Sequence, residues 1–144
     1  MWTFHGNSTP TLDDKGRVTV PARWRFDGLE ELLAVPDGAN PCLRLLSRET
    51  FAELLQKVQA GATLSEQDRL GIVRMYSSSA FPCAIDKQGR VLLPADYIRR
   101  FGFSGEVTLV GAWRHIEVWR PEDWVAYQEK YTPMIGAGAQ FFGL

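Results

Sequence analysis

The chain has 144 residues, carries 16 Lys and Arg against 17 Asp and Glu, and is 45% apolar. This composition excludes a disordered, collagen-like or coiled-coil chain, and the length suits about one domain. No apolar run approaches the roughly 18 residues that a membrane helix needs, and the N-terminus has no signal-peptide pattern. We therefore expect a cytoplasmic protein without a membrane partner.

The first predicted element belongs to an internal repeat. The segment Thr11–Ala22 returns 73 positions later as Ala84–Ala95, and six of the twelve paired positions are identical. Each copy predicts a strand, a tight turn, a second strand and a short helix that starts at a proline and ends near a glycine. The glycines of the two turns, Gly16 and Gly89, supply the positive φ that such turns need.

A second hairpin is predicted after each short helix. In the first half it joins residues 32–35 to residues 42–46 through Pro36-Asp37-Gly38, and in the second half it joins residues 107–111 to residues 116–119. A longer helix closes each unit, one capped by Ser47 and the other beginning near Pro121. An extra helix, opened by Ser65, leads into the second repeat.

The end of the chain is rich in small residues. Residues 136–140 read Gly-Ala-Gly-Ala-Gln, and we expect them to be loosely ordered. Phe141 and Phe142 could instead dock on a neighbour, but a solvated tail is the preferred interpretation. Among the five tryptophans, most of which we assign to the core, Trp2 and Trp113 are the best candidates for an interface.

The predicted architecture is α+β. Two β-hairpin–helix units in tandem, each too small for a core of its own, are expected to pair about a pseudo-twofold axis in one body. The first unit covers residues 1–60, a connecting helix covers 61–80, and the second unit covers 81–144.

Neither a metal site nor an enzyme is expected. A zinc site would have to combine Cys42 and Cys83 with His5 and His115, and no pair among them has ligand spacing. The cysteines are more simply two buried reduced thiols. Catalytic motifs such as Gly-x-Ser-x-Gly or His-Glu-x-x-His do not occur, so no cofactor and no small-molecule substrate is expected.

The two arginines that follow the turns are the main candidate functional residues. If Val18 and Val20 face the core, Arg17 and Thr19 face outward, and Arg90 is the equivalent of Arg17 in the second copy. A surface arginine paired to the aspartate four residues earlier is the alternative interpretation. Residues 11–25 and 84–100 each carry a net charge of +2, which leaves −5 for the rest of the chain. This gathering of charge favours a nucleic-acid partner, which a β-ribbon tip can contact in the major groove.

These repeats resemble the two signatures of the MraZ family, within the broader AbrB-like (SpoVT-AbrB, MazE) swapped-hairpin superfamily. The resemblance rests on Leu12-Asp13-x-Lys15-Gly16-Arg17-x-x-x-Pro21 and on Asp86-x-Gln88-Gly89-Arg90-Val91-Leu92-Leu93-Pro94, and it extends to Phe4-x-Gly6 and to residues 105–119. It implies a pseudo-twofold double-split β-barrel. It also implies a bacterial, nucleoid-associated transcriptional regulator of the division and cell-wall genes.

Members of that family resemble one another in binding short direct repeats in promoter DNA, and many form rings of several subunits. The residues expected to contact double-stranded DNA are Lys15, Gly16, Arg17, Lys87 and Arg90. Gln88 stands where the first copy has Lys15, so the two copies need not contribute equally. An antitoxin-like module that binds another protein is the alternative function.

Overall fold

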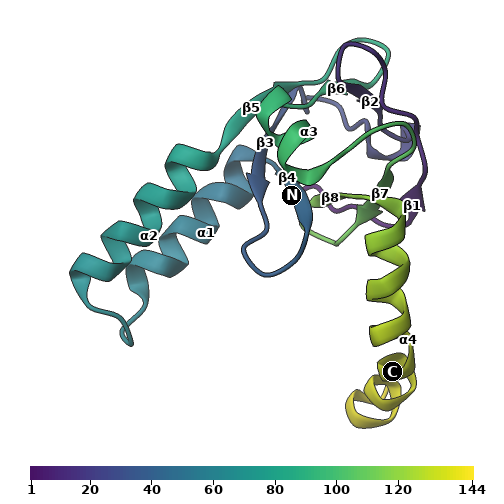
Figure 1. Cartoon of the computed structure of the whole chain (residues 1–144). Coiled ribbons are helices and arrows are strands. Elements are labelled where there is room, and N and C mark those ends of the chain that lie inside the picture. Colours follow the sequence, from purple (N-terminus) through teal and green to yellow (C-terminus); the bar gives the residue numbers. More distant parts are fainter.

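The computed structural model describes residues 1–144 and confirms a mixed α+β architecture (Figure 1). One antiparallel sheet has six strands in the order β1-β7-β8-β4-β3-β5, and a separate ribbon pairs β2 with β6. The strands of the large sheet, in that order, are Asn7–Ser8, Thr108–Gly111, Ile116–Trp119, Cys42–Leu46, Glu31–Pro36 and Phe81–Ala84. The ribbon strands β2 and β6 are Arg17–Thr19 and Arg90–Leu92.

The two copies of the repeat pair with each other in the ribbon. Val18 lies directly opposite Val91, its own equivalent 73 positions later. The backbone bonds that flank this pair are also equivalent, because Val20 N–H donates to Gly89 C=O and Leu93 N–H donates to Gly16 C=O, both at 2.9 Å. The ribbon therefore has local twofold symmetry.

The large sheet exchanges strands between the two halves of the chain. β1, which precedes the first turn, pairs with β7 of the second half, and β5, which precedes the second turn, pairs with β3 of the first half. The centre of the sheet joins β4 to β8. Because each half completes the sheet of the other, the expected single body is observed.

The main core lies between the large sheet and the ribbon. Apolar side chains alternate inward from both layers, as the two-residue period of a strand requires. Two smaller clusters lie outside it, one involving Tyr76 of the extra helix and one involving Trp124. Fully buried members of the main core include Phe4, Val18, Leu32, Leu43, Val91 and Leu109.

Helices α1 (Arg48–Ala60) and α2 (Glu66–Ser79) form a hairpin that projects from the sheet (Figure 1). Both predicted caps are confirmed: Ser47 Oγ accepts from Thr50 N–H, and Ser65 Oγ accepts from Asp68 N–H. The short helices of the repeats are a 3₁₀ turn at Ala22–Trp24 and α3 at Ala95–Phe101.

The final helix, α4 (Pro121–Phe142), corrects the expectation that residues 136–140 are loosely ordered. Trp124 and Tyr127 stack on each other and pack against the buried Trp119, which anchors the first turns. Once those turns are fixed, further residues add backbone hydrogen bonds, except Pro133, which has no N–H, and the helix continues through Gly136 and Gly138. None of the helices combines the length and the apolar character that crossing a membrane demands.

Candidate nucleic-acid interface

The outer face of the β2–β6 ribbon carries both candidate arginines. Arg17 pairs with Leu92 and Thr19 pairs with Arg90, while the Val18–Val91 pair between them faces the core. Since neighbouring residues of a strand point to opposite faces, these four side chains share the side turned away from the core. The prediction that Val18 and Val20 face inward, with Arg17 and Thr19 outward, is confirmed.

The turn before each ribbon strand is held by its aspartate. Asp13 Oδ1 accepts hydrogen bonds from the N–H groups of Lys15 at 3.0 Å and Arg17 at 2.8 Å. In the second copy Asp86 Oδ1 accepts from Gln88 and Arg90 at 3.0 and 2.9 Å. The bond from the backbone N–H of the arginine is the leading cause that lowers the pKa of each aspartate, so both carboxylates stay ionised at neutral pH.

The same aspartates orient the arginine side chains. Arg17 Nε donates to Asp13 Oδ2 and Arg90 Nε donates to Asp86 Oδ2, both at 2.7 Å. The ion pair of the alternative interpretation therefore exists. It engages only one edge of each guanidinium, since Arg17 keeps both terminal nitrogens free of protein partners and Arg90 uses one N–H on Gln88 Oε1 at 3.2 Å. The side chains are 25% and 33% exposed, so the free donors reach solvent.

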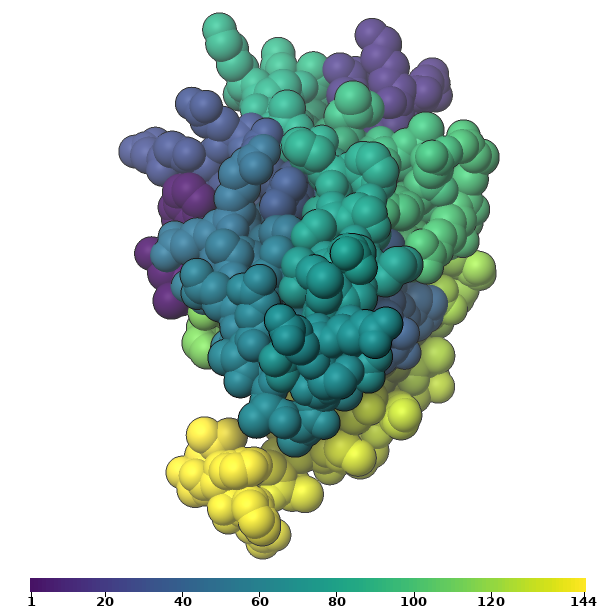
Figure 2. Space-filling view, turned by 90° about the vertical axis from the view of Figure 1, so that its left-hand side faces the viewer, coloured from purple at the N-terminus to yellow at the C-terminus, as the bar shows by residue number.

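The other expected contact residues surround these arginines. Lys15 and Lys87 are exposed within the turns, whereas Gly16 is buried and adopts φ +83°. The two turns project side by side at one end of the molecule, purple for the first copy and green for the second, away from α4 (Figures 1 and 2). All five residues named from the sequence therefore lie in this region.

Two other basic residues counted in the repeat segments are engaged elsewhere. Arg23 donates to the backbone carbonyls of His5 and Asn7. Arg100 lies over the ring of Phe101 and lines a groove beside α2. A net charge summed over a segment cannot separate these side chains from those at the turns, because it carries no information about direction.

The sequence interpretation overlooked Arg25, whose guanidinium lies against the second turn. A comparison of equivalent positions just beyond the repeat could have singled out Arg25, because the second copy has Ile98 at the matching position.

The candidate interface residues Trp2 and Trp113 differ in exposure. Trp2 is partly buried because it stacks on Phe26 at a centroid distance of 6.4 Å. Trp113 is 62% exposed in the β7–β8 turn, where it adopts φ +73°. Only Trp113 therefore presents most of its ring to solvent.

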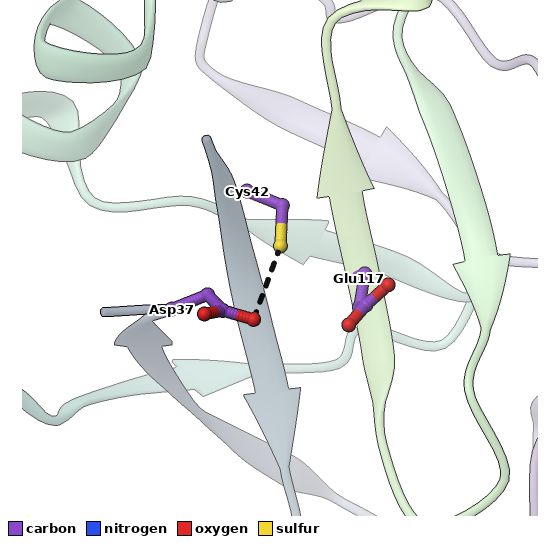
Figure 3. A group of neighbouring side chains, drawn as sticks. All are labelled: Asp37, Cys42 and Glu117. Atoms are coloured by element: carbon purple, nitrogen blue, oxygen red, sulfur yellow. Dashed lines mark hydrogen bonds between the residues drawn. The ribbon is translucent and has the colours of Figure 1, made fainter. Parts of the chain in front are cut away.

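A separate acidic group lies on the other side of the large sheet (Figure 3). Asp37, Cys42 and Glu117 bring their ligand atoms within 4.8 Å of one another, and the Cys42 thiol donates to Asp37 Oδ2 at 3.7 Å. His115 Nε2 forms a hydrogen bond with Glu117 Oε2 at 3.0 Å, and its side chain is largely covered. The combination of both cysteines with both histidines does not form, because Cys83 packs in the main core and Cys42 in the cluster with Trp119.

Both thiols are free and buried, as predicted. Burial raises the pKa of Cys83 to about 11 and raises the pKa of Cys42 far above its ordinary range, with the Glu117 and Asp37 charges adding to the effect. The neutral Cys42 thiol donates to the ionised carboxylate of Asp37, so these polar atoms find their partners within the protein. We therefore assign the cluster of Asp37, Cys42 and Glu117 a structural role.

Comparison with known proteins assigns the family. A family model described as "MraZ protein, putative antitoxin-like" matches residues 3–73 and 77–136. The chain is 36% identical over 126 residues to a protein of Cutibacterium acnes, covering 88% of this chain and 87% of the relative. It is 35% identical over 135 residues to one of Corynebacterium kroppenstedtii, covering 94% and 93%. Both relatives are named "Transcriptional regulator MraZ". The chain, with its two paired Asp-x-x-Gly-Arg turns, therefore belongs to the MraZ family.

Proposed function

We propose that this protein is a DNA-binding transcriptional regulator without enzymatic activity, and that its partner is double-stranded promoter DNA. The observation that carries the proposal is the pair of outward arginines, Arg17 and Arg90, each held at one edge by an aspartate and free at the other. The names of its relatives support the same function.

The chemistry of the ribbon suits this task. A guanidinium presents donors in a fixed fork that matches phosphate oxygens or the O6 and N7 atoms of guanine. The aspartates restrict the arginine side chains before DNA arrives, so less conformational entropy is lost on binding. Lys15 and Lys87 add charge at the two turns, and the positive φ of Gly16 in the first turn and of Gly89 in the second supplies the backbone geometry of each turn.

The finer parts of the proposal concern assembly and target. We propose a ring-shaped homo-oligomer that binds short direct repeats upstream of its own operon and controls the division and cell-wall genes from the nucleoid. Several weakly binding subunits on successive repeats gain affinity by effective concentration. The far half of α4 supports self-association, because Ile135 and Phe141 are 71% and 84% exposed.

Two further statements about the fold belong to the same proposal. We assign the paired repeats to the pseudo-twofold double-split β-barrel of the AbrB-like superfamily. The units are assigned to residues 1–60 and 81–144, with residues 61–80 as the connection. The Val18–Val91 pairing between equivalent residues supports this symmetry.

An antitoxin-like module that neutralises a protein is the second candidate, favoured by the description of the matching family model. The two functions separate on purification from cells. A stoichiometric protein partner without retained DNA would favour the second candidate.

The direct test is a gel-shift titration with a duplex from the region upstream of the gene. We expect Arg17→Ala to weaken binding by about 1–3 kcal/mol per engaged subunit while the circular dichroism spectrum stays unchanged. Arg48→Ala is the matched control, because Arg48 is exposed and paired with Glu31, on α1 and away from the ribbon. Unchanged affinity in Arg17→Ala would refute the assignment of the ribbon.

A further inference from the structure

The two turns differ in what packs against them, despite their shared backbone. A Cβ added to Gly16 would lie 2.9 Å from Ile98 Cδ1, whereas one added to Gly89 would overlap the Arg25 side chain. Arg25 and Ile98 are 73 positions apart and are therefore equivalent in the repeat. The local symmetry thus brings the short-helix segment of each copy against the turn of the other copy.

Arg25 is fixed in this position by the backbone of the ribbon. Its Nε and Nη2 donate to Val20 C=O at 3.1 and 2.8 Å, and Val20 N–H in turn donates to Gly89 C=O at 2.9 Å. On the other side Leu93 N–H makes the equivalent bond to Gly16 C=O, but an isoleucine cannot add the charged donor. The guanidinium is therefore part of the second turn's framework, although it comes from the first copy.

The side chain retains donors for a ligand. A guanidinium has five N–H donors, and two of those of Arg25 are used on Val20, which leaves about three. Arg25 is exposed and makes no ion pair with an acidic residue, unlike Arg17 and Arg90. Its positive charge is therefore not cancelled locally, and its orientation is already fixed.

The two turns differ in their basic residues, and Arg25 adds to this difference. The first turn holds Lys15 beside Arg17, and the second turn holds Gln88 at the position that matches Lys15. Arg25 of the first copy adds a further cation to the second turn, which already carries Lys87 of its own. It lies beside the turn backbone and outside the outward-facing ladder positions of the ribbon.

We propose that Arg25 is an additional DNA-binding residue, which contacts a backbone phosphate beside the second turn and is supplied to that turn by the first copy. This inference rests on the proposed DNA-binding function. It makes the two turns chemically unequal: the first uses Lys15, whereas the second uses its own Lys87 together with Arg25 of the first copy, so the halves of a binding site need not be equivalent.

The test compares Arg25→Gln with Arg23→Gln in salt-dependent gel-shift titrations of the upstream duplex. Both changes remove one exposed arginine that donates to backbone carbonyls, and the two residues are neighbours in the same short-helix segment. We expect Arg25→Gln to raise the Kd by about fivefold and to lower the slope of log K against log salt by about 0.9 per engaged turn. Arg23→Gln is expected to leave both close to wild type.

A second variant tests whether an arginine at the equivalent position of the other copy strengthens binding. Ile98→Arg places the missing cation beside the first turn and is expected to tighten binding and increase the salt slope. Arg25→Lys keeps the charge and should retain the wild-type slope. Melting curves for every variant verify that the protein remains folded.

The outcomes distinguish a failure of the Arg25 assignment from a failure of the proposed DNA-binding function. Wild-type affinity and slope in Arg25→Gln, together with weakened binding in Arg17→Ala, would overturn the role of Arg25 and leave the DNA-binding function in place. Absence of binding by the unaltered protein would overturn both.

Discussion

Val18 and Val91 lie directly opposite each other in the β2–β6 ribbon, and each is fully buried. They are the same position of the repeat, so the local twofold axis passes between them. The ribbon that carries both arginines therefore packs on the core through this pair, with Val20 and Leu93 buried beside it.

This contact predicts coupled losses of stability. Val18→Ala and Val91→Ala should each lower the free energy of unfolding by about 2 kcal/mol, because each removes buried methyl groups and leaves a cavity. The effects should not add in the double variant, since residues in contact share that cavity. Urea titrations measure this, and a double variant that is additive within about 0.3 kcal/mol would contradict a direct contact.

The turn aspartates predict an acid-sensitive ribbon. Hydrogen bonds from backbone N–H groups lower the pKa of Asp13 and Asp86. A lowered pKa in the folded state contributes stability that is present above the ordinary aspartate value of about 4 and is lost as the pH falls through the lowered value.

Replacing both aspartates, as Asp13→Asn with Asp86→Asn, should therefore flatten the dependence of stability on pH below about 4. Thermal melting between neutral and acid pH measures this. Asp14→Asn in the same first turn is the control, because Asp14 is exposed and accepts no hydrogen bond. If the double variant lost stability at acid pH as wild type does, the carboxylates of Asp13 and Asp86 would not be the cause of that loss.

The far half of α4 predicts an effect on assembly. Ile135, Phe141 and Phe142 are each at least 71% exposed, and no residue of the same chain covers them. Replacing all three with serine should reduce the native mass of the proposed oligomer, while the monomer fold, whose core lies elsewhere, remains intact. Native mass spectrometry measures the assembly. Gln128→Ser with Glu129→Ser is the control, because it changes exposed polar positions of the same helix. An unchanged mass in the triple variant would show that this surface does not hold subunits together.

Two glycines predict opposite changes in stability. A Cβ on Gly111 would lie 2.7 Å from the backbone of Phe4 and His5, which cannot move aside without breaking the edge of the sheet. Gly111→Ala should therefore cost about 1–3 kcal/mol. Gly71 lies inside α2 with nothing within 4 Å of such an atom, so Gly71→Ala should stabilise the protein by about 0.5–1 kcal/mol. Calorimetry measures both changes, and a Gly111→Ala variant as stable as wild type would contradict the close approach.

The elements came from local signals that act over a few residues. The serine caps at Ser47 and Ser65 and the Pro36-Asp37-Gly38 turn were visible in the sequence because their hydrogen bonds are made within three or four positions. The helical order of residues 136–140, which the local sequence did not predict, has the opposite cause. Residues 136–140 are helical because α4 is anchored on Trp119, and a contact to another element leaves no mark on the local pattern.

The repeat, the glycine turns at Gly16 and Gly89 and the outward direction of Arg17 follow from the sequence alone, because strand alternation and turn geometry depend on neighbouring residues. The contact of Arg25 of one copy with Gly89 of the other, and the directions of Arg23 and Arg100, depend on the three-dimensional fold. Strand exchange joins residues 47 to 103 positions apart, and the direction of a long charged side chain depends on what that exchange places beside it.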